Sequence, residues 1–489
     1  MKKNISIIGA GFSGLAAACY LAKDGYNVTI YEKHSQIGGR ARTIEKDGFL
    51  FDMGPSWYWM PDVFERFFGD FGKKVSDYYE LKRLSPGYRI YFNDEYLDVP
   101  ASLEELYEVF EKHEKGSAAK LKQFLKEAEY KYNVGIHELV YKPGVNISEL
   151  MDARLITGIF KLDVFKSIRK HIAKNFKNPK LVQLLEFPVL FLGALPQNTP
   201  ALYSLMNYAD LVLGTWYPMG GMAVVPEAMK KLALELGVKF ETGVDVSAIE
   251  LNGNLAKILK AQKEYNGFDA LISSADYHFT DQVLLPPTHR HYTKDYWESR
   301  KMAPSSILFY VGINKKLPNL LHHNLFFDED FELHSQEIYT TPKWPSKPLL
   351  YVSCTSKTDP VTAPEGYENL TILIPVAPGL NESEEIKEKY FNLAIERIEK
   401  KIGMSFKENI IFKHIYSPKN FINDYNSFKG NAYGLANTLL QTAHLKPSIK
   451  SKKVKNLFYT GQLTVPGPGV PPSLISGKLV ADQINNYFK

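Results

Sequence analysis

A glycine-rich turn at residues 9–14 lies between an apolar, β-branched run at residues 5–8 and a helical stretch that extends to about Lys23. A second apolar run at residues 27–31 ends at Glu32, about 20 residues after Gly11. A run of this kind, apolar without alternation, is typical of a parallel strand buried on both faces. The order strand, G-x-G-x-x-G, helix, strand and acid predicts a dinucleotide-binding βαβ unit.

Each glycine of this pattern has a physical task. Gly9 makes the tight turn, Gly11 lets the backbone approach a pyrophosphate, and Gly14 lets the helix pack closely on the strand. The amino end of the helix, where Phe12 and Ser13 stand, offers free N–H groups and a positive dipole end to phosphates. We expect Glu32 to accept hydrogen bonds from ribose hydroxyls. The alternative is a glycine turn that binds no ligand.

A second glycine pair decides between dinucleotides. Gly38, Gly39 and Arg40 follow shortly after Glu32 and Lys33, and they resemble the second fingerprint of FAD enzymes of the amine-oxidase superfamily. The glycines permit close approach to a pyrophosphate, and the guanidinium can hydrogen-bond it in a fork. FAD is therefore favoured over NAD. The alternative is a surface turn with solvated arginines.

Later segments are typical of the same nucleotide domain. Residues 238–249 predict paired short strands, and residues 268–276 predict another strand; either could also be plain core. A strand at 456–460 precedes a loop, 461–472, that is rich in glycine and proline. Ser473 is the predicted N-cap of a last helix that runs to about residue 486. The amino end of that helix could face negative charge on a reduced flavin ring.

Composition excludes several classes of protein. A chain of 489 residues is too long for one hydrophobic core, so two or three domains are expected. The net charge of +5 indicates no nucleic-acid partner. Cys19 and Cys354 are the only cysteines, which excludes a disulfide framework and a four-cysteine zinc site. The apolar run at 187–195 is too short to span a bilayer, and no signal peptide is recognisable, so a cytoplasmic protein is expected.

Together the motifs resemble the bacterial-type phytoene desaturases, which are FAD-dependent carotenoid desaturases. The resemblance rests on the turn at 9–14 with Glu32, the pair at 38–40, and the segments 52–57, 216–221 and 461–472, in this order along essentially the whole chain. Met219 stands where many relatives carry arginine. The resemblance and the motifs imply these FAD contacts: Gly9, Gly11, Phe12, Ser13, Gly14, Glu32, Lys33, Gly39, Arg40, Gly54, Pro55, Ser56, Val246, Gly461, Gln462, Val470 and Pro471.

The expected fold is α/β: a Rossmann-like FAD-binding domain assembled from discontinuous segments, an α+β substrate domain and a helical membrane-associating region. The FAD-binding domain takes residues 1–75, 216–288 and 450–489, the substrate domain takes 76–102 and 289–449, and the helical region takes 103–215. Strand-like runs at 306–311 and 370–374 indicate the sheet of the substrate domain.

Residues 161–180 carry seven lysines or arginines against one aspartate, with Phe165, Ile168, Ile172 and Phe176 at helical spacing. A basic amphipathic helix of this kind can lie on an anionic membrane surface. The alternative is a solvated helix whose apolar face packs on the domain. Residues 187–195, with Leu202, Leu205, Met206, Leu211, Val212 and Leu213, could form the wall of a hydrophobic tunnel or belong to the core.

The resemblance implies desaturation of a C40 carotene, 15-cis-phytoene toward lycopene, by hydride transfer to FAD. It also implies a peripheral position on the inner face of the cell membrane and reoxidation by a quinone or oxygen. Asp152 and Arg154 are weak candidates for assisting proton loss, and no metal site is expected because the paired histidines lack further ligands. Alternatives are a desaturase of hydroxylated carotenoids, a carotene cis–trans isomerase, an amine oxidase and a non-catalytic carotenoid-binding protein.

Overall fold

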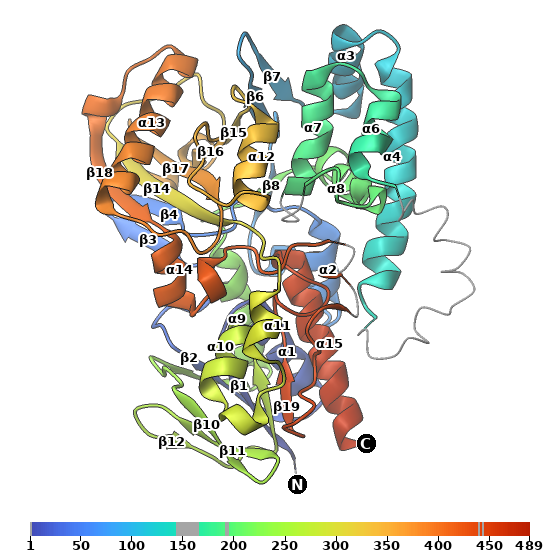
Figure 1. The fold of residues 1–489 in the computed structure, drawn as a ribbon, viewed down its shortest axis with the longest axis vertical. Helices are drawn as coiled ribbons and strands as arrows, with labels where there is room; N and C mark the ends of the chain where they lie inside the picture. Colours follow the sequence, from blue (N-terminus) through green and yellow to red (C-terminus); the bar gives the residue numbers. More distant parts are fainter. Residues whose placement is uncertain (1, 143–165, 191–194, 439–440, 443–444) are drawn as a thin grey trace.

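The computed structural model describes residues 2–142, 166–190, 195–438, 441–442 and 445–489 (Figure 1). A parallel sheet forms the lower half of the view, and a larger sheet and a layer of helices lie side by side in the upper half. Asp152, Arg154 and Phe165 lie outside the described residues.

The lower sheet has five parallel strands, in the order β19 (Leu457–Tyr459), β13 (Ala270–Ser273), β1 (Asn4–Ile8), β2 (Asn27–Glu32) and β9 (Lys239–Thr242). In β1, Ile7 pairs with Ile30 on one side and Ile272 on the other, and all three are fully buried. The sheet therefore unites segments far apart in the sequence, as the motif order predicts.

Three helices pack together beside this sheet. α1 (Phe12–Lys23) lies against both α9 (Val224–Glu235) and α15 (Val470–Phe488). A Cβ at Gly477 of α15 would lie 2.6 Å from the Ala16 side chain, so only glycine permits this approach. The predicted N-cap at Ser473 is wrong: α15 begins at Val470 with Gly469 as its N-cap. Proline is favoured in the first turn of a helix, which explains the earlier start at 470–472.

The predicted pairing within residues 238–249 is also wrong. β9 pairs with β2, whereas β10 (Ala248–Asn252) pairs with β11 (Leu255–Lys260), which in turn pairs with β12 (Glu264–Tyr265). The two predicted strands thus exist but belong to different sheets.

The upper sheet has seven strands, in the order β18 (Ile410–Tyr416), β14 (Ser305–Ile313), β17 (Glu368–Val376), β16 (Leu350–Ser353), β15 (His323–Phe326), β6 (Tyr88–Tyr91) and β7 (Tyr96–Val99). All neighbours are antiparallel except β15 and β6. The long helix α13 (Glu384–Ile402) packs its apolar face on this sheet, with Phe391 at 5.5 Å from Phe309. The strand-like runs at 306–311 and 370–374 are confirmed as parts of β14 and β17.

The helical layer contains α3 (Leu103–His113), α4 (Ser117–Val134), α6 (Ile168–Asn175), α7 (Pro179–Leu190) and α8 (Leu205–Leu211) (Figure 1). Ile168, Ile172 and Phe176 are buried, and the Phe176 ring lies 5.7 Å from Phe110 of α3 and 6.0 Å from Phe124 of α4. The prediction that these three side chains face a membrane is therefore wrong, because neighbouring helices cover them.

Short elements connect these layers: β3 (Thr43–Lys46), β4 (Phe49–Asp52), α2 (Pro61–Gly69), β5 (Leu81–Arg83), β8 (Trp216–Pro218), α10 (Tyr277–Phe279), α11 (Lys294–Glu298), α12 (Phe331–Tyr339) and α14 (Pro418–Tyr425). Among the described residues, no helix is both long and apolar enough to cross a membrane.

Candidate functional site

A cavity of about 520 Å³ runs between the lower, parallel sheet and the upper sheet. Its volume is within the size range of cofactor sites. Of the predicted FAD contacts, all but Gly14 line it: Gly9, Gly11, Phe12, Ser13, Glu32, Lys33, Gly39, Arg40, Gly54, Pro55, Ser56, Val246, Gly461, Gln462, Val470 and Pro471. A Cβ at Gly14 would lie 2.2 Å from the Gly9 carbonyl oxygen, so this glycine serves the close packing of α1 on the turn.

One end of the cavity is built around the carboxylate of Glu32. Its Oε2 accepts a hydrogen bond from the Ala10 N–H at 2.7 Å, and its Oε1 accepts one from the His34 N–H at 3.0 Å. Val246 reaches the same end because the Val244 N–H donates to the Glu32 carbonyl oxygen at 2.8 Å. The carboxylate, which has about four lone-pair sites, keeps capacity for hydroxyl donors from the cavity.

Three loops, which contain Gly11, Gly39 and Gly54, meet at the cavity with almost no side chain between them. A Cβ at Gly39 would lie 3.2 Å from the Gly11 Cα, and one at Gly54 would lie 2.2 Å from the Arg40 carbonyl oxygen. The Gly38 N–H donates to the Ala10 carbonyl oxygen at 2.9 Å, which joins the second glycine pair to the first turn. The backbone is therefore bare at this junction, as close approach of a pyrophosphate would require.

Arg40 provides the charge at this junction. Its Nη1 donates to Gln462, its Nη2 donates to Ser427 at 3.2 Å and to the Asn431 carbonyl oxygen at 3.3 Å, and its Nε is buried without a partner among the described residues. Burial lowers the pKa of Arg40, and the nearby carboxylate of Asp276 opposes that shift. Among the described residues Arg40 makes no salt bridge, and a half-buried cation of this kind fits an anionic ligand such as the FAD pyrophosphate.

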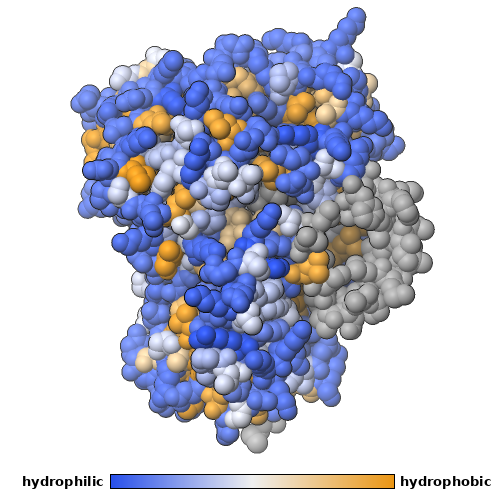
Figure 2. All heavy atoms as spheres, viewed as in Figure 1, coloured by the Kyte–Doolittle hydropathy of each residue, from blue (hydrophilic) through white to orange (hydrophobic). Residues whose placement is uncertain are grey.

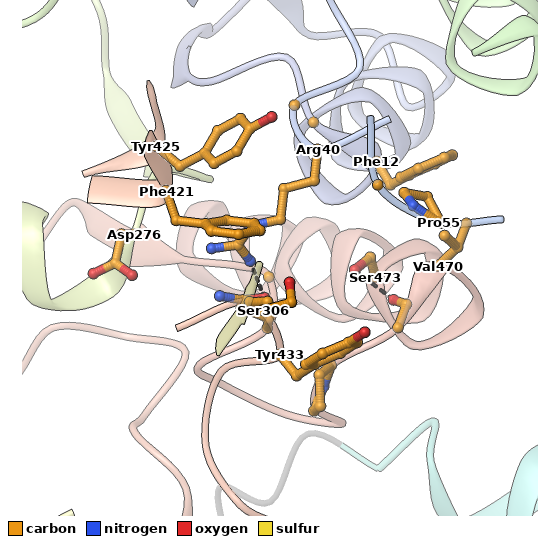
Figure 3. Close-up of a pocket in the computed structure, with 18 of the residues that line it drawn as sticks. Phe12, Arg40, Pro55, Asp276, Ser306, Phe421, Tyr425, Tyr433, Val470 and Ser473 are labelled. Atoms are coloured by element: carbon orange, nitrogen blue, oxygen red, sulfur yellow. Dashed lines mark hydrogen bonds between the residues drawn. The ribbon is translucent and has the colours of Figure 1, made fainter. Parts of the chain in front are cut away.

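Figure 3 shows how the side chains gather around this junction. Arg40 extends toward Phe421 and Tyr425, whereas Phe12, Pro55 and Val470 cluster together on the other side. Tyr425 also contacts Arg40, with its ring centre 5.4 Å from the guanidinium. The first cluster is charged and aromatic and the second is apolar, so the cavity changes character along its length.

The amino end of the last helix, α15, has few free N–H groups with which to face an anionic ligand. Pro471 and Pro472 occupy two of the first positions of α15 and carry no N–H, which leaves Val470 as the donor there. A buried lysine adds positive charge nearby: the Lys446 Nζ donates to Asn437 Oδ1 at 2.9 Å and would lie 3.2 Å from a Cβ at Gly467. Burial lowers the pKa of Lys446 to about 8.

Aromatic and aliphatic side chains from the upper sheet, the helical layer and connecting segments form the other end of the cavity: Trp57, Trp59, Phe187, Met206, Leu308, Leu325, Phe327, Tyr339, Leu349, Tyr351 and Tyr433. Phe187 and Met206, two of the predicted tunnel residues, line the cavity at the edge of a core cluster, whereas Leu205 and Leu211 belong to the same cluster but do not line the cavity. Residues 191–194 lie outside the described part of the chain.

Two titratable groups at the cavity wall, His334 and Asp276, are held by hydrogen bonds from the backbone. His334 accepts from the Leu349 N–H at 3.0 Å and donates to the Pro375 carbonyl oxygen at 2.9 Å, and burial lowers its pKa to about 4. Asp276 accepts from the Phe279 N–H at 3.1 Å, and burial raises its pKa to about 6. Within the described residues, no group of three or more potential ligands could hold a metal ion.

Several wall residues were missed by sequence reasoning. Asp276 lies beyond the end of β13 and is the N-cap of α10, and Tyr351, Tyr425 and Tyr433 stand in the sequence without a motif around them. Their place at the cavity depends on how distant strands pair.

Comparison with known proteins shows which family has this arrangement. The family model of flavin containing amine oxidoreductases matches residues 12–485. The carotenoid 3,4-desaturase of Haloarcula japonica is 38% identical over 99% of this chain and 98% of its own length. The zeta-carotene-forming phytoene desaturase of Myxococcus xanthus is 30% identical over 99% of this chain and 94% of its own.

A solved oxidoreductase from Methanosarcina mazei has the same fold, with a TM-score of 0.61 at 16% identity over 98% of this chain and 100% of that one. The chain thus belongs to the flavin-containing amine oxidoreductase family and, within it, to the carotenoid desaturases, FAD-dependent oxidoreductases that act on CH–CH bonds.

Proposed function

We propose that this enzyme desaturates a C40 carotene, converting 15-cis-phytoene toward lycopene. The observation that carries the proposal is the continuity of the cavity, whose nucleotide end at Glu32 and Arg40 leads into an apolar end at Phe187 and Phe327. Bound FAD would supply a two-electron acceptor for a hydride from an allylic carbon, while a proton leaves the adjacent carbon and the double bond forms between the two. A hydrocarbon held among aromatic side chains beside it has no polar group to satisfy.

The protein's own contribution is to bind, orient and exclude water. Gly9, Gly11, Gly39 and Arg40 would hold the pyrophosphate, and Glu32 would hold the ribose. The aromatic wall would align the reacting C–H bond with the ring, which raises the effective concentration of the two reacting groups. His334 uses both ring nitrogens in hydrogen bonds to the backbone, so it is not free to accept the substrate's proton.

A hydroxylated carotenoid is the second candidate. The hydroxyl-bearing rings of Tyr339 and Tyr433 line the otherwise apolar wall, and burial raises the pKa of Tyr433 to about 12. These groups could hydrogen-bond a substrate hydroxyl, and the Haloarcula japonica relative bears the name of a 3,4-desaturase rather than a phytoene desaturase. A site built to bind a hydroxyl would discriminate strongly against a substrate that lacks it.

The two candidates are separated by parallel incubations. FAD-loaded protein receives liposomes containing either 15-cis-phytoene or a hydroxylated carotenoid, with a quinone as acceptor, and the products are identified by their absorption spectra. We expect phytoene to gain conjugated double bonds. Conversion of the hydroxylated carotenoid alone would overturn the assignment of substrate.

We also propose that the enzyme works at the surface of a membrane, on its inner face, and passes electrons to a quinone or to oxygen. Because the apolar side of α6 is buried, attraction must come from its charges. Arg169 pairs with Glu186 and Glu332, and Lys180 pairs with Asp94, but Lys170 and Lys174 are exposed. On the face shown in Figure 2, apolar residues form small separate groups among hydrophilic ones.

Sedimentation with anionic liposomes tests this proposal. Each lysine near an anionic surface contributes about 1 kcal/mol, so reversing two charges should weaken binding strongly at low salt. We expect Lys170→Glu with Lys174→Glu to pellet less than the wild type while retaining its FAD. Equal sedimentation of both proteins would show that α6 does not contact the membrane.

A further inference from the structure

A hydrogen-bonded chain of three side chains leads from a fully buried histidine to the wall of the cavity. The Nδ1 of His323 lies 2.8 Å from the Tyr351 hydroxyl, and that hydroxyl donates to Ser56 Oγ at 2.9 Å. His323 stands on β15 and Tyr351 on the antiparallel strand β16, where Tyr351 pairs with Leu325. The two side chains are therefore diagonal neighbours on one face of the sheet.

The surroundings of His323 determine which group donates at each step of this hydrogen-bonded chain. Its ring has no exposed surface and stacks on Trp57, with the ring centres 4.1 Å apart and the planes at 12°. Its Nε2 is buried and has no hydrogen-bond partner among the described residues. A buried N–H without an acceptor is rarer than a buried acceptor without a donor. The ring proton therefore belongs on Nδ1, which has a partner, and not on Nε2. Burial also holds the pKa of His323 well below its usual value, which keeps the imidazole neutral.

This tautomer orients every hydroxyl that follows. The His323 Nδ1–H donates to the Tyr351 oxygen, the Tyr351 O–H donates to Ser56 Oγ, and the Ser56 proton is left for an acceptor in the cavity. A hydrocarbon polyene offers no acceptor. The isoalloxazine ring of FAD does, because its carbonyl oxygens and ring nitrogens lie along one edge.

We propose that His323 and Tyr351 are positioning residues that hold the Ser56 hydroxyl as a hydrogen-bond donor to the polar edge of the FAD ring. The inference rests on the proposed placement of FAD, in which Ser56 follows Gly54 and Pro55 at the cavity wall. Accepting a hydride places negative charge on the ring. A donor that is already oriented stabilises that charge without reorganisation, and the ring becomes a stronger oxidant.

The reduction potential of bound FAD tests the proposal without any carotenoid, so the outcome is independent of which substrate the enzyme uses. The potential is measured by equilibration with a reference dye, after FAD content has been determined for each variant. Ser56→Ala, Tyr351→Phe and His323→Phe each break the chain at one link, and each should shift the potential to a more negative value.

Two variants at adjacent positions serve as controls. His323→Asn keeps an N–H close to the position of Nδ1, so it should restore a potential near that of the wild type, whereas His323→Phe should not. His322→Asn alters the neighbouring histidine, whose Nδ1 lies 2.7 Å from Thr358 Oγ1 and outside the chain, and should leave the potential unchanged.

Three outcomes would overturn the proposal. Unchanged potentials in Ser56→Ala and Tyr351→Phe would show that the chain does not reach the ring. A shift in Ser56→Ala alone would remove the positioning role of His323 and Tyr351. Loss of FAD from Ser56→Ala, which deletes a single oxygen from a cavity-lining side chain, would show that Ser56 holds the cofactor rather than tuning it.

Discussion

Replacing Glu32 by alanine removes a carboxylate that accepts hydrogen bonds from the backbone and also faces the cavity where we expect FAD to bind. Glu32 ends β2, is only 6% exposed, and accepts the N–H groups of Ala10 and His34 at 2.7 and 3.0 Å. Both donors belong to the loops that shape the nucleotide end of the cavity. The variant should therefore lose folded stability and FAD affinity, by separate amounts.

The structure sets the size of each loss. An orphaned buried donor costs about 1–3 kcal/mol, and here water can enter from the cavity, so the two donors together should cost the apoprotein about 2 kcal/mol. Hydrogen bonds from the ribose to a charged carboxylate are worth about 1.5–3 kcal/mol, which corresponds to about a 10- to 100-fold loss of FAD affinity. Glu32→Gln keeps one acceptor oxygen and should lose less of both.

Urea denaturation of the apoprotein measures the first loss, and titration with FAD measures the second. Glu241→Ala is the matched control, because Glu241 stands on the adjacent strand β9, where it pairs with Tyr31 of β2, but it is exposed to solvent. We expect the control to resemble the wild type in both assays. Unchanged FAD affinity in Glu32→Ala would refute the assignment of Glu32 to the ribose.

Three further predictions concern the cofactor and the core. FAD should be bound non-covalently, because residues 461–472 contain no cysteine or histidine; acid precipitation should release the yellow chromophore, and colour left in the pellet would contradict this. Gly11→Val would place a branched side chain where the pyrophosphate must pass, so the purified variant should contain no FAD although it folds; wild-type flavin content would count against the site. Burial raises the pKa of Asp210, which is 3% exposed, to about 7. The folded state therefore holds a proton that the unfolded state has lost, and stability should fall by about 1.4 kcal/mol per pH unit as pH rises from about 4 to about 7. Asp210→Asn should flatten that slope in urea titrations, and an unchanged slope would exclude Asp210 as its source.

The sequence was most informative where function demands a local backbone shape. The strand, turn and helix around Gly9, Gly11 and Gly14 could be predicted because glycine spacing and the acid at Glu32 are fixed by short-range geometry. Residues that meet only through sheet pairing could not. His323 and Tyr351 are brought to Ser56 by the register of β15 and β16, and no pattern near any of them signals that contact.

The basic stretch at 161–180 shows why amphipathicity alone was ambiguous. An apolar stripe formed by Ile168, Ile172 and Phe176 has the same spacing whether a membrane or another helix covers it. Phe110 and Phe124, distant in sequence, are the partners that decide the matter. The start of α15 differs from the prediction for another reason: Ser473 is a favourable cap, but Pro471 and Pro472 are suited to the first turn of a helix, so α15 begins before Ser473.

Anaerobic mixing of the FAD-loaded enzyme with liposomes containing 15-cis-phytoene tests directly whether this cavity desaturates a carotene. Flavin absorbance and the polyene spectrum are followed in the same sample, without quinone or oxygen. We predict that the flavin bleaches in step with the gain of conjugated double bonds, with one FAD reduced for each new double bond. A flavin that stays oxidised in the presence of phytoene, yet bleaches with dithionite, would contradict the proposed function.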